Sequence, residues 1–198
     1  MTTKSGRNRL RIIGGEWRGR KLAFPDLPGL RPTPDRVRET LFNWLRDILP
    51  GARCLDLFAG SGALGFEALS RGAQEVVMVD RHPAVITQLK QHVQQLKAVN
   101  ARVVQAEALA FLQGPSRPFD IIFLDPPFQG NLLDPCLKKL AQPGWLAATA
   151  WLYLETDRRI PLPPVPADWN ILRHKQAGQV GYYLLQRTSA SGTQGDPS

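Results

Sequence analysis

The feature that most constrains the fold is the alternation, from Arg53 onward, of short apolar runs with helical patterns. Such alternation is typical of a parallel β-sheet with helices on both faces. Several runs are apolar without polar alternation, as expected of strands buried on both sides. Five strands are predicted in this way, at residues 53–58, 75–80, 101–106, 119–125 and 150–155.

Helices are predicted between these strands and before them. In the segment 83–97, apolar residues recur at spacings of three and four, and Pro83 suits a first helical turn. Ahead of the core, TPDRVRETLFNWLRDIL predicts a helix with Thr33 as N-cap and Pro34 at the first helical position. The other helices are predicted at residues 62–71, 107–113 and 131–141.

Two further pairs of strands complete the predicted fold. RLRIIGGEWRGRKLAF is typical of a hairpin around a glycine-rich turn, and WNILRHKQ with QVGYYLLQR predicts an antiparallel pair that closes one sheet edge. The fold class is therefore α/β, a doubly wound, mostly parallel seven-stranded sheet with an N-terminal β-hairpin arm. We divide the chain into the basic arm (1–30), the main domain (31–187) and a polar tail expected to be disordered (188–198).

Charge is concentrated near the N-terminus. Residues 1–46 carry eleven Lys or Arg against four Asp or Glu, which accounts for +7 of the net charge of +8. This asymmetry favours a polyanionic partner, because neutralising phosphates releases counterions, although a solvated basic face kept for solubility is the alternative. Aromatic side chains lie among the basic residues of the hairpin and could stack on RNA bases. The alternative is that these aromatic side chains pack on the domain. The predicted RNA contacts are Arg9, Arg11, Trp17, Arg18, Arg20, Lys21, Arg36 and Arg38.

Composition excludes several classes of protein. No apolar run approaches the roughly 18 residues that span a bilayer, and the basic N-terminus is followed by no continuous apolar segment of a secretory signal. We therefore expect a cytoplasmic protein without a membrane partner. Cys54 and Cys136 lie in predicted regular elements and are interpreted as buried thiols rather than reactive groups.

A glycine loop indicates a nucleoside-containing cofactor. LDLFAGSGALG follows a strand and opens a helix, and Asp80 ends the next strand, where it can accept hydrogen bonds from ribose hydroxyls. This spacing permits NAD, but Asp56 in the first strand would repel a pyrophosphate and suits the sulfonium and ammonium of S-adenosylmethionine instead. Asp56 facing a backbone amide is the alternative. Glu107 is a candidate for the adenine surroundings or, equally, an acid at a helix start.

The turn FLDPPF is predicted to hold the group that reacts. Asp125 falls at the carboxyl end of a strand, where ligands of such sheets bind. Pro126 and Pro127 fix the backbone and offer no N–H, so the turn presents only acceptors beside the ring of Phe128. Such a corner suits an exocyclic amine on a base, whose two N–H groups would be held while its lone pair faces an electrophile. The alternative is a strand-end turn whose aspartate caps a helix.

These motifs resemble a known family. LDLFAGSGALG, the strand-end Asp80 and FLDPPF are similar to class I S-adenosylmethionine-dependent methyltransferases with a Rossmann-like fold. RIIGGEWRGRKL, RPTPDRVRETLFNWL, LDLFAGSGALGFEALSRGA and AGQVGYYLLQR resemble the RsmD family, the 16S ribosomal RNA guanine-N2 methyltransferases, from about Arg9 to Arg187. The resemblance implies methylation of guanine 966 of 16S RNA on the small ribosomal subunit. Adenine-N6 methylation, or a non-catalytic RNA-binding assembly factor, are the rival hypotheses.

The resemblance also implies a set of site residues. The transfer itself demands no metal, since the extra proton can leave after it, and we expect a monomer. Asp125, Pro126, Pro127 and Phe128 would hold the guanine amine. Related enzymes more often have Asn or Asp where this chain has Glu107, so the adenine contact can run through the Ala108 backbone instead. The residues expected to hold S-adenosylmethionine are Asp56, Phe58, Ala59, Gly60, Ser61, Gly62, Asp80, Glu107 and Ala108.

Overall fold

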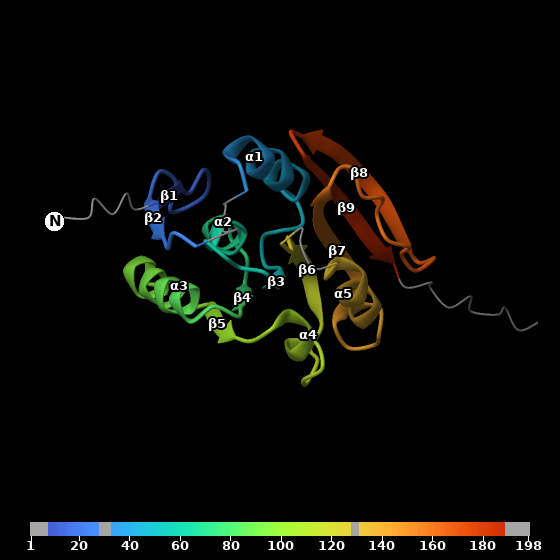
Figure 1. The fold of residues 1–198 in the computed structure, drawn as a ribbon. Coiled ribbons are helices and arrows are strands. Elements are labelled where there is room, and N and C mark those ends of the chain that lie inside the picture. The colour runs from blue at the N-terminus through green and yellow to red at the C-terminus, as the bar shows by residue number, and fades with distance from the viewer. Residues whose placement is uncertain (1–7, 28–32, 128–130, 189–198) are drawn as a thin grey trace, which may run out of the picture.

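The computed structural model describes residues 8–27, 33–127 and 131–188 and contains a central seven-stranded sheet (Figure 1). Its strands follow the order β5-β4-β3-β6-β7-β9-β8, and β9 runs antiparallel to both of its neighbours. The other adjacent pairs are parallel, which confirms the predicted doubly wound, mostly parallel sheet. The strands are β3 (Arg53–Asp56), β4 (Glu75–Asp80), β5 (Ala101–Gln105), β6 (Phe119–Leu124), β7 (Leu146–Asp157), β8 (Trp169–Ala177) and β9 (Val180–Thr188).

The direction of strand addition reverses at β3. This strand pairs with β4 on one side and with β6 on the other, so that Asp56 lies opposite Met78 and Phe123. In open α/β sheets, ligands bind outside the carboxyl ends of the strands at such a switch point. The glycine loop after β3 and the DPPF turn after β6 therefore lie at neighbouring strand ends.

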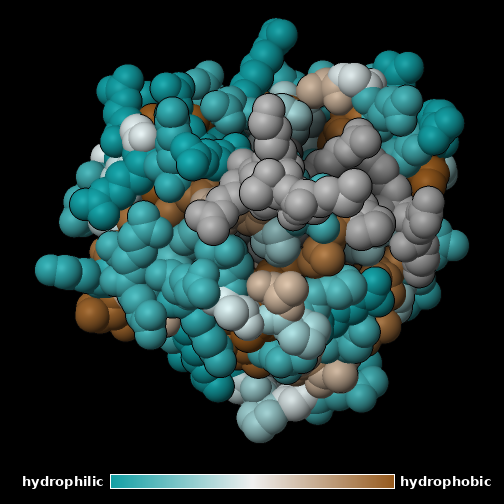
Figure 2. Space-filling model, turned by 60° about the vertical axis from the view of Figure 1, so that its left-hand side comes forward, coloured by the Kyte–Doolittle hydropathy of each residue, from teal (hydrophilic) through white to brown (hydrophobic). Residues whose placement is uncertain are grey.

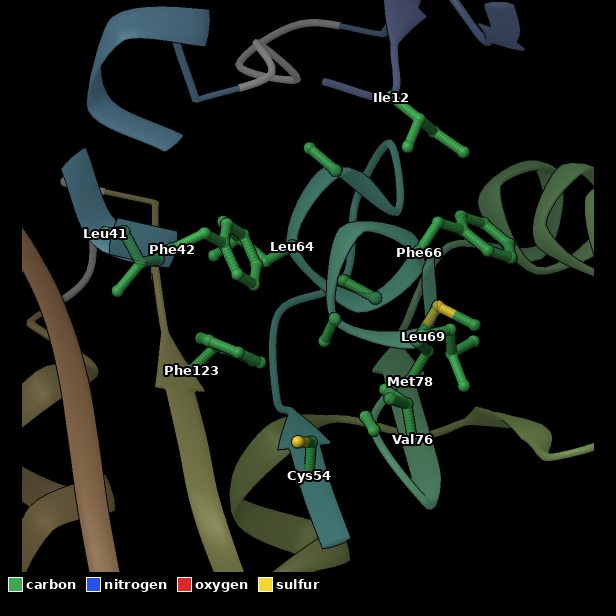
Figure 3. Close-up of a cluster of buried hydrophobic side chains, with 14 of the residues drawn as sticks. Ile12, Leu41, Phe42, Cys54, Leu64, Phe66, Leu69, Val76, Met78 and Phe123 are labelled. Carbon is green, nitrogen blue, oxygen red and sulfur yellow. The ribbon is translucent and has the colours of Figure 1, made fainter. Parts of the chain in front are cut away.

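Helices cover both faces of the sheet (Figure 1). On one face, buried side chains of α1 (Asp35–Trp44), α2 (Ala63–Ser70) and α3 (Pro83–Leu96) pack with strand residues such as Val76 and Phe123 (Figure 3). On the other face, α4 (Ala108–Phe111) and α5 (Leu133–Leu140) pack in a second apolar cluster. The helices correspond to the predicted ones, with ends shifted by up to two residues, with two exceptions. The helix α1 ends at Trp44, five residues before the predicted end at Leu49, and α4 is a single turn.

The N-terminal hairpin is part of this core. Strands β1 (Asn8–Arg11) and β2 (Lys21–Phe24) pair antiparallel, as predicted. The apolar side chains of the hairpin pack in the same cluster as α1, α2 and α3, while hydrophilic side chains cover most of the face turned forward in Figure 2. The hairpin residues buried in that cluster are Leu10, Ile12, Trp17, Leu22 and Phe24.

The start of α1 differs from the prediction. Thr33 was expected to cap this helix, but Pro34 has an extended backbone (ψ 146°) and the helix begins at Asp35 without a side-chain cap. The Thr33 hydroxyl instead donates a hydrogen bond to Oδ2 of Asp125, at 3.4 Å. The segment before α1 therefore contacts the DPPF turn directly.

Candidate functional site

The glycine loop has the backbone geometry that only glycine adopts without strain. Gly60 and Gly62 have φ of 50° and 78°, in the left-handed region. A Cβ on Gly62 would lie 2.6 Å from the ring of Phe66, and one on Gly65 would lie 2.7 Å from Met78. The loop glycines thus permit both the turn and the close packing of α2 on the sheet.

Asp80 is joined to this loop by a hydrogen bond. Its Oδ2 accepts from the backbone N–H of Gly60 at 3.0 Å, and its Oδ1 accepts from the N–H of His82 at 2.8 Å. The carboxylate is half-buried and has lone pairs beyond these two bonds. The predicted ribose acceptor and the predicted loop are therefore side by side at the ends of β3 and β4.

Asp56 lies beneath the loop, with only 1% of its surface exposed. Its Oδ2 accepts a hydrogen bond from the N–H of Gly65 at 3.0 Å. Burial raises the pKa of Asp56 to about 7, backbone N–H groups of Gly65 and Phe58 oppose this shift, and the charge of Asp80 adds to it. One carboxylate oxygen of Asp56 thus accepts from a backbone amide, which is the alternative that the sequence left open. Among the ion pairs of the described residues, none involves Asp56, so its buried charge has no cation beside it.

The remaining residues predicted to hold the cofactor fall into two groups. Ala59 and Ser61 are buried in the loop and Phe58 is half-buried against the second apolar cluster, while Ala108 is buried at the start of α4. Glu107 is different. Its side chain is 61% exposed and pairs with Arg81 at 3.6 Å, an arrangement that favours its interpretation as a solvated acid at a helix start.

The DPPF turn follows β6 beside the loop. Pro126 is buried and Pro127 is exposed, whereas Phe128 lies outside the described residues. Burial raises the pKa of Asp125 well above its ordinary value, and the charges of Glu155 and Asp56 raise it further, while the Thr33 hydrogen bond lowers it. The turn thus presents a carboxyl group that is poorly solvated and close to other acids.

A cavity of about 310 Å³ opens beside this turn. Pro126 and Pro127 form part of its wall, the start of α5 another part, and the end of β7 contributes Glu155, Thr156 and Asp157. Sequence reasoning missed Glu155, although its place at the carboxyl end of a predicted strand was a usable signal. It also missed Thr33 as a partner of Asp125, because the two are 92 residues apart.

The predicted RNA contacts divide by exposure. Trp17 is 7% exposed and packs in the core, and its backbone N–H donates to Oγ of Ser70 at 2.9 Å. Its predicted role in stacking on RNA is therefore wrong in this structure, and the alternative, packing on the domain, holds. The cations that do face solvent are Arg9, Arg11, Arg18, Arg20, Lys21 and Arg36.

Arg38 is also a correction, since none of its surface is exposed. Its guanidinium contacts Oδ1 of Asp35 at 2.5 Å and Oε2 of Glu67 at 3.5 Å, and it donates to the carbonyl of Arg11 at 2.9 Å. A guanidinium so enclosed has no free face for a phosphate. Arg38 instead joins α1, α2 and the hairpin.

Other candidate chemistries find little support in the part of the chain that the structure describes. There, no three His, Cys, Asp or Glu side chains group closely enough to hold a metal ion. No described helix combines the length and apolar character that crossing a membrane requires. Cys54 and Cys136 are unpaired and buried, as predicted, and burial raises the pKa of both thiols.

The strand order and the glycine loop with its strand-end acid, together with the acceptor turn after β6, define a class I methyltransferase. Comparisons agree: a protein of Escherichia coli (strain K12) named ribosomal RNA small subunit methyltransferase D is 52% identical over 192 residues, 97% of each chain. The protein of that name in Haemophilus influenzae is 45% identical and covers 94% of this chain and 98% of its own. A solved Escherichia coli structure, yhhF, has a TM-score of 0.85 at 51% identity over 92% of this chain and 99% of that one.

The family model described as Conserved hypothetical protein 95 matches residues 10–186. The chain belongs to this family, the RsmD family. The resemblance noted in the sequence is thereby confirmed over nearly the whole chain.

Proposed function

We propose that this enzyme transfers a methyl group from S-adenosylmethionine to the exocyclic N2 of guanine 966 in 16S ribosomal RNA, within the small ribosomal subunit. The observation that carries the proposal is the position of Asp125 and Pro126 at the end of β6, one strand from the glycine loop. Relatives named ribosomal RNA small subunit methyltransferase D, at 52% and 45% identity, support the RNA substrate.

The residues around the loop fit the cofactor. Asp80 would accept from the ribose, since its carboxylate is half-buried at the loop and retains acceptor positions. The buried charge of Asp56 would favour the cationic methionine part, and the backbone of Ala108 at the start of α4 would lie near the adenine. When bound, S-adenosylmethionine supplies an electrophilic methyl group on a sulfonium.

The turn would activate the amine by holding it. An exocyclic amine is a poor nucleophile because its lone pair is delocalised into the ring. The Asp125 carboxylate and the Pro126 carbonyl can each accept one N–H, which leaves the nitrogen free to pyramidalise with its lone pair directed out of the plane of the base. Phe128 is proposed to stack on the base, which would offset part of the cost of taking it out of its helix by about 1–3 kcal/mol.

The exposed cations would position the RNA. Six of the predicted contacts face solvent on the hairpin and on α1, and they can neutralise phosphates without reading sequence. Because the hairpin packs in the domain core, these charges are held in place rather than on a free arm. We propose a cytoplasmic monomer that requires no metal.

Analysis of the methylated nucleoside tests the proposal. Small subunits from cells that lack this enzyme are incubated with the protein and radiolabelled cofactor, and their RNA is digested to nucleosides. The proposal predicts label in N2-methylguanosine at a single position of 16S RNA. Label in N6-methyladenosine would favour the rival reaction on adenine, and particle binding without transfer would favour the non-catalytic assembly factor.

A further inference from the structure

Glu155, at the end of β7, is a buried acid that has no role in the proposed methyl transfer as described above. Only 3% of its surface is exposed, yet it lines the cavity together with Pro126 and Pro127. Its Oε1 accepts a hydrogen bond from the hydroxyl of Tyr153 at 2.7 Å. Burial raises the pKa of Tyr153, so this hydroxyl stays protonated and remains the donor.

Glu155 and Asp125 form an acidic pair with shared surroundings. The Thr33 hydroxyl, which lies near both carboxyl groups, donates to Asp125. The charge of Glu155 helps to raise the pKa of Asp125, and burial raises the pKa of Glu155 itself. Among residues 8–27, 33–127 and 131–188, no lysine or arginine forms an ion pair with either of them. Two buried carboxyl groups without a cation are costly unless donors bind them.

The donors available to this pair are few. A carboxylate offers about four acceptor positions, and at Glu155 the Tyr153 hydroxyl accounts for one of them. The two prolines contribute no N–H to the cavity wall, so a ligand that presents adjacent N–H groups would complete the pair. The cavity therefore favours a base edge rich in donors.

Guanine and adenine differ at the atom beside the methylated amine. In guanine, N1 carries a hydrogen next to the N2 amine, so its edge presents N–H donors in a row. In adenine, N1 is an acceptor next to the N6 amine. A buried carboxylate opposite N1 thus accepts a hydrogen bond from guanine. With adenine, the carboxylate and N1 are both acceptors, and burying them against each other without a hydrogen bond costs free energy.

We propose that Glu155 is the specificity-determining residue of the enzyme, which accepts the N1–H of the target guanine while Asp125 and the Pro126 carbonyl hold its N2 amine. This inference rests on the proposed function and adds the reason for the choice of base. The DPPF turn selects an exocyclic amine, and Glu155 selects the base that carries it.

The test separates N1–H from the amine. 2-Aminopurine keeps the amine at position 2, but its N1 is an acceptor and it lacks the N1 hydrogen. Small subunits are reconstituted with 16S RNA that carries guanine or 2-aminopurine at the target position, and kcat/KM is measured for both. We expect the wild-type enzyme to prefer guanine by about 10- to 100-fold, the range of one good base-edge contact.

Glu155→Gln tests the assignment of this preference to one residue. The amide can turn its NH2 toward N1 of 2-aminopurine, so the variant should lose activity on guanine and the preference should shrink to about threefold or reverse. Glu75→Gln is the matched control, because Glu75 starts β4 at the opposite end of the strands and pairs with Arg53 and Arg117. It should keep the wild-type preference.

Failures of the two hypotheses are distinguishable. If the wild-type enzyme methylates no guanine at all, the proposed function fails. If it methylates guanine and 2-aminopurine equally well, or if Glu155→Gln lowers both rates by the same factor, the role of Glu155 in base choice is overturned. The wild-type comparison needs no variant, so equal rates on the two bases would overturn the role of Glu155 even if Glu155→Gln does not fold.

Discussion

Substitution of Glu67 by glutamine should destabilise the protein more than any exposed charge change. Glu67 is fully buried in α2, where Oε1 accepts from Nε of Arg71 at 2.7 Å and Oε2 accepts from the N–H of Ile13 at 2.9 Å. Oε2 also faces Nη1 of Arg38 at 3.5 Å. One carboxylate therefore ties the hairpin and α1 to the helix that opens at the glycine loop.

The size of the loss in stability depends on the contacts that each partner of Glu67 keeps after the substitution. Removing one member of a buried ion pair costs about 3–5 kcal/mol, because the other charge stays buried. Arg38 would keep its contact with Asp35, and the glutamine oxygen could still accept from Ile13, so we expect the lower end of that range. Arg71 is partly exposed and adds less than about 1 kcal/mol. The free energy of unfolding should fall by about 3 kcal/mol.

Urea unfolding measures this change. With a slope of about 2 kcal/mol/M, the midpoint should move down by roughly 1.5 M. Asp134→Asn is the matched control, since Asp134 pairs with Lys138 on the solvent-facing side of α5 and the loss of this pair should cost less than about 1 kcal/mol. A shift for Glu67→Gln no larger than that of the control would refute this account of the hairpin's attachment.

Three further predictions concern the site and the RNA surface. Asp125→Asn removes a carboxyl group whose raised pKa costs stability as the pH rises above the ordinary pKa of aspartate, because the unfolded state ionises more readily than the folded state. Tm at pH 8 should therefore rise by at least about 2 °C, and the gain should shrink toward pH 4; an unchanged Tm at pH 8 would contradict this. Because the pKa of Asp56 is about 7 and a cationic cofactor favours its ionised form, binding of S-adenosylmethionine at pH 6 should release protons. The affinity should fall by up to about tenfold for each pH unit below 7. Calorimetry in buffers of different ionisation enthalpy checks this, and pH-independent binding would count against it. Replacing Arg18, Arg20 or Lys21 by alanine should lower the salt dependence of particle binding by about one counterion for each phosphate that is no longer neutralised, while cofactor affinity stays unchanged; an unaltered salt slope would mean that these cations are only a solvated face.

The sheet could be predicted because its strands are buried on both faces and therefore lack polar alternation. The strand order at the edge was less accessible. The sequence indicated an antiparallel pair at the C-terminus, and the structure places the later strand, β9, between β7 and β8. In retrospect the composition agrees, since β9 carries buried residues such as Tyr182 and Leu185, whereas β8 is exposed along most of its length.

The errors at Trp17 and Arg38 have a common cause. Both residues were assigned to RNA because of their types and their basic surroundings. Their burial depends on partners far along the chain, Ser70 and Glu67, which pairwise sequence spacing does not reveal. Local pattern therefore identified a basic hairpin correctly but could not tell which side chains of the hairpin and of α1 face solvent.

In the candidate site, too, local sequence patterns placed some residues correctly and missed the contacts that depend on distant partners. Asp80 and Asp125 could be placed because each ends a predicted strand, and Asp56 because it lies in a predicted strand just before the glycine loop; the carboxyl ends of parallel strands meet at one edge. Thr33 was assigned a local role as a helix cap, whereas the structure gives it a distant partner. Glu155 also ends a strand, but its burial beside Asp125 depends on the pairing of β6 with β7.

The most direct test of the central claim, that the turn after β6 holds the reacting amine, is single-turnover methyl transfer by Asp125→Ala. Transfer to small subunits and S-adenosylmethionine affinity are measured on the same preparation. The account predicts that transfer is nearly abolished while cofactor affinity stays within a few-fold of the wild-type value. Transfer at the wild-type rate would contradict it.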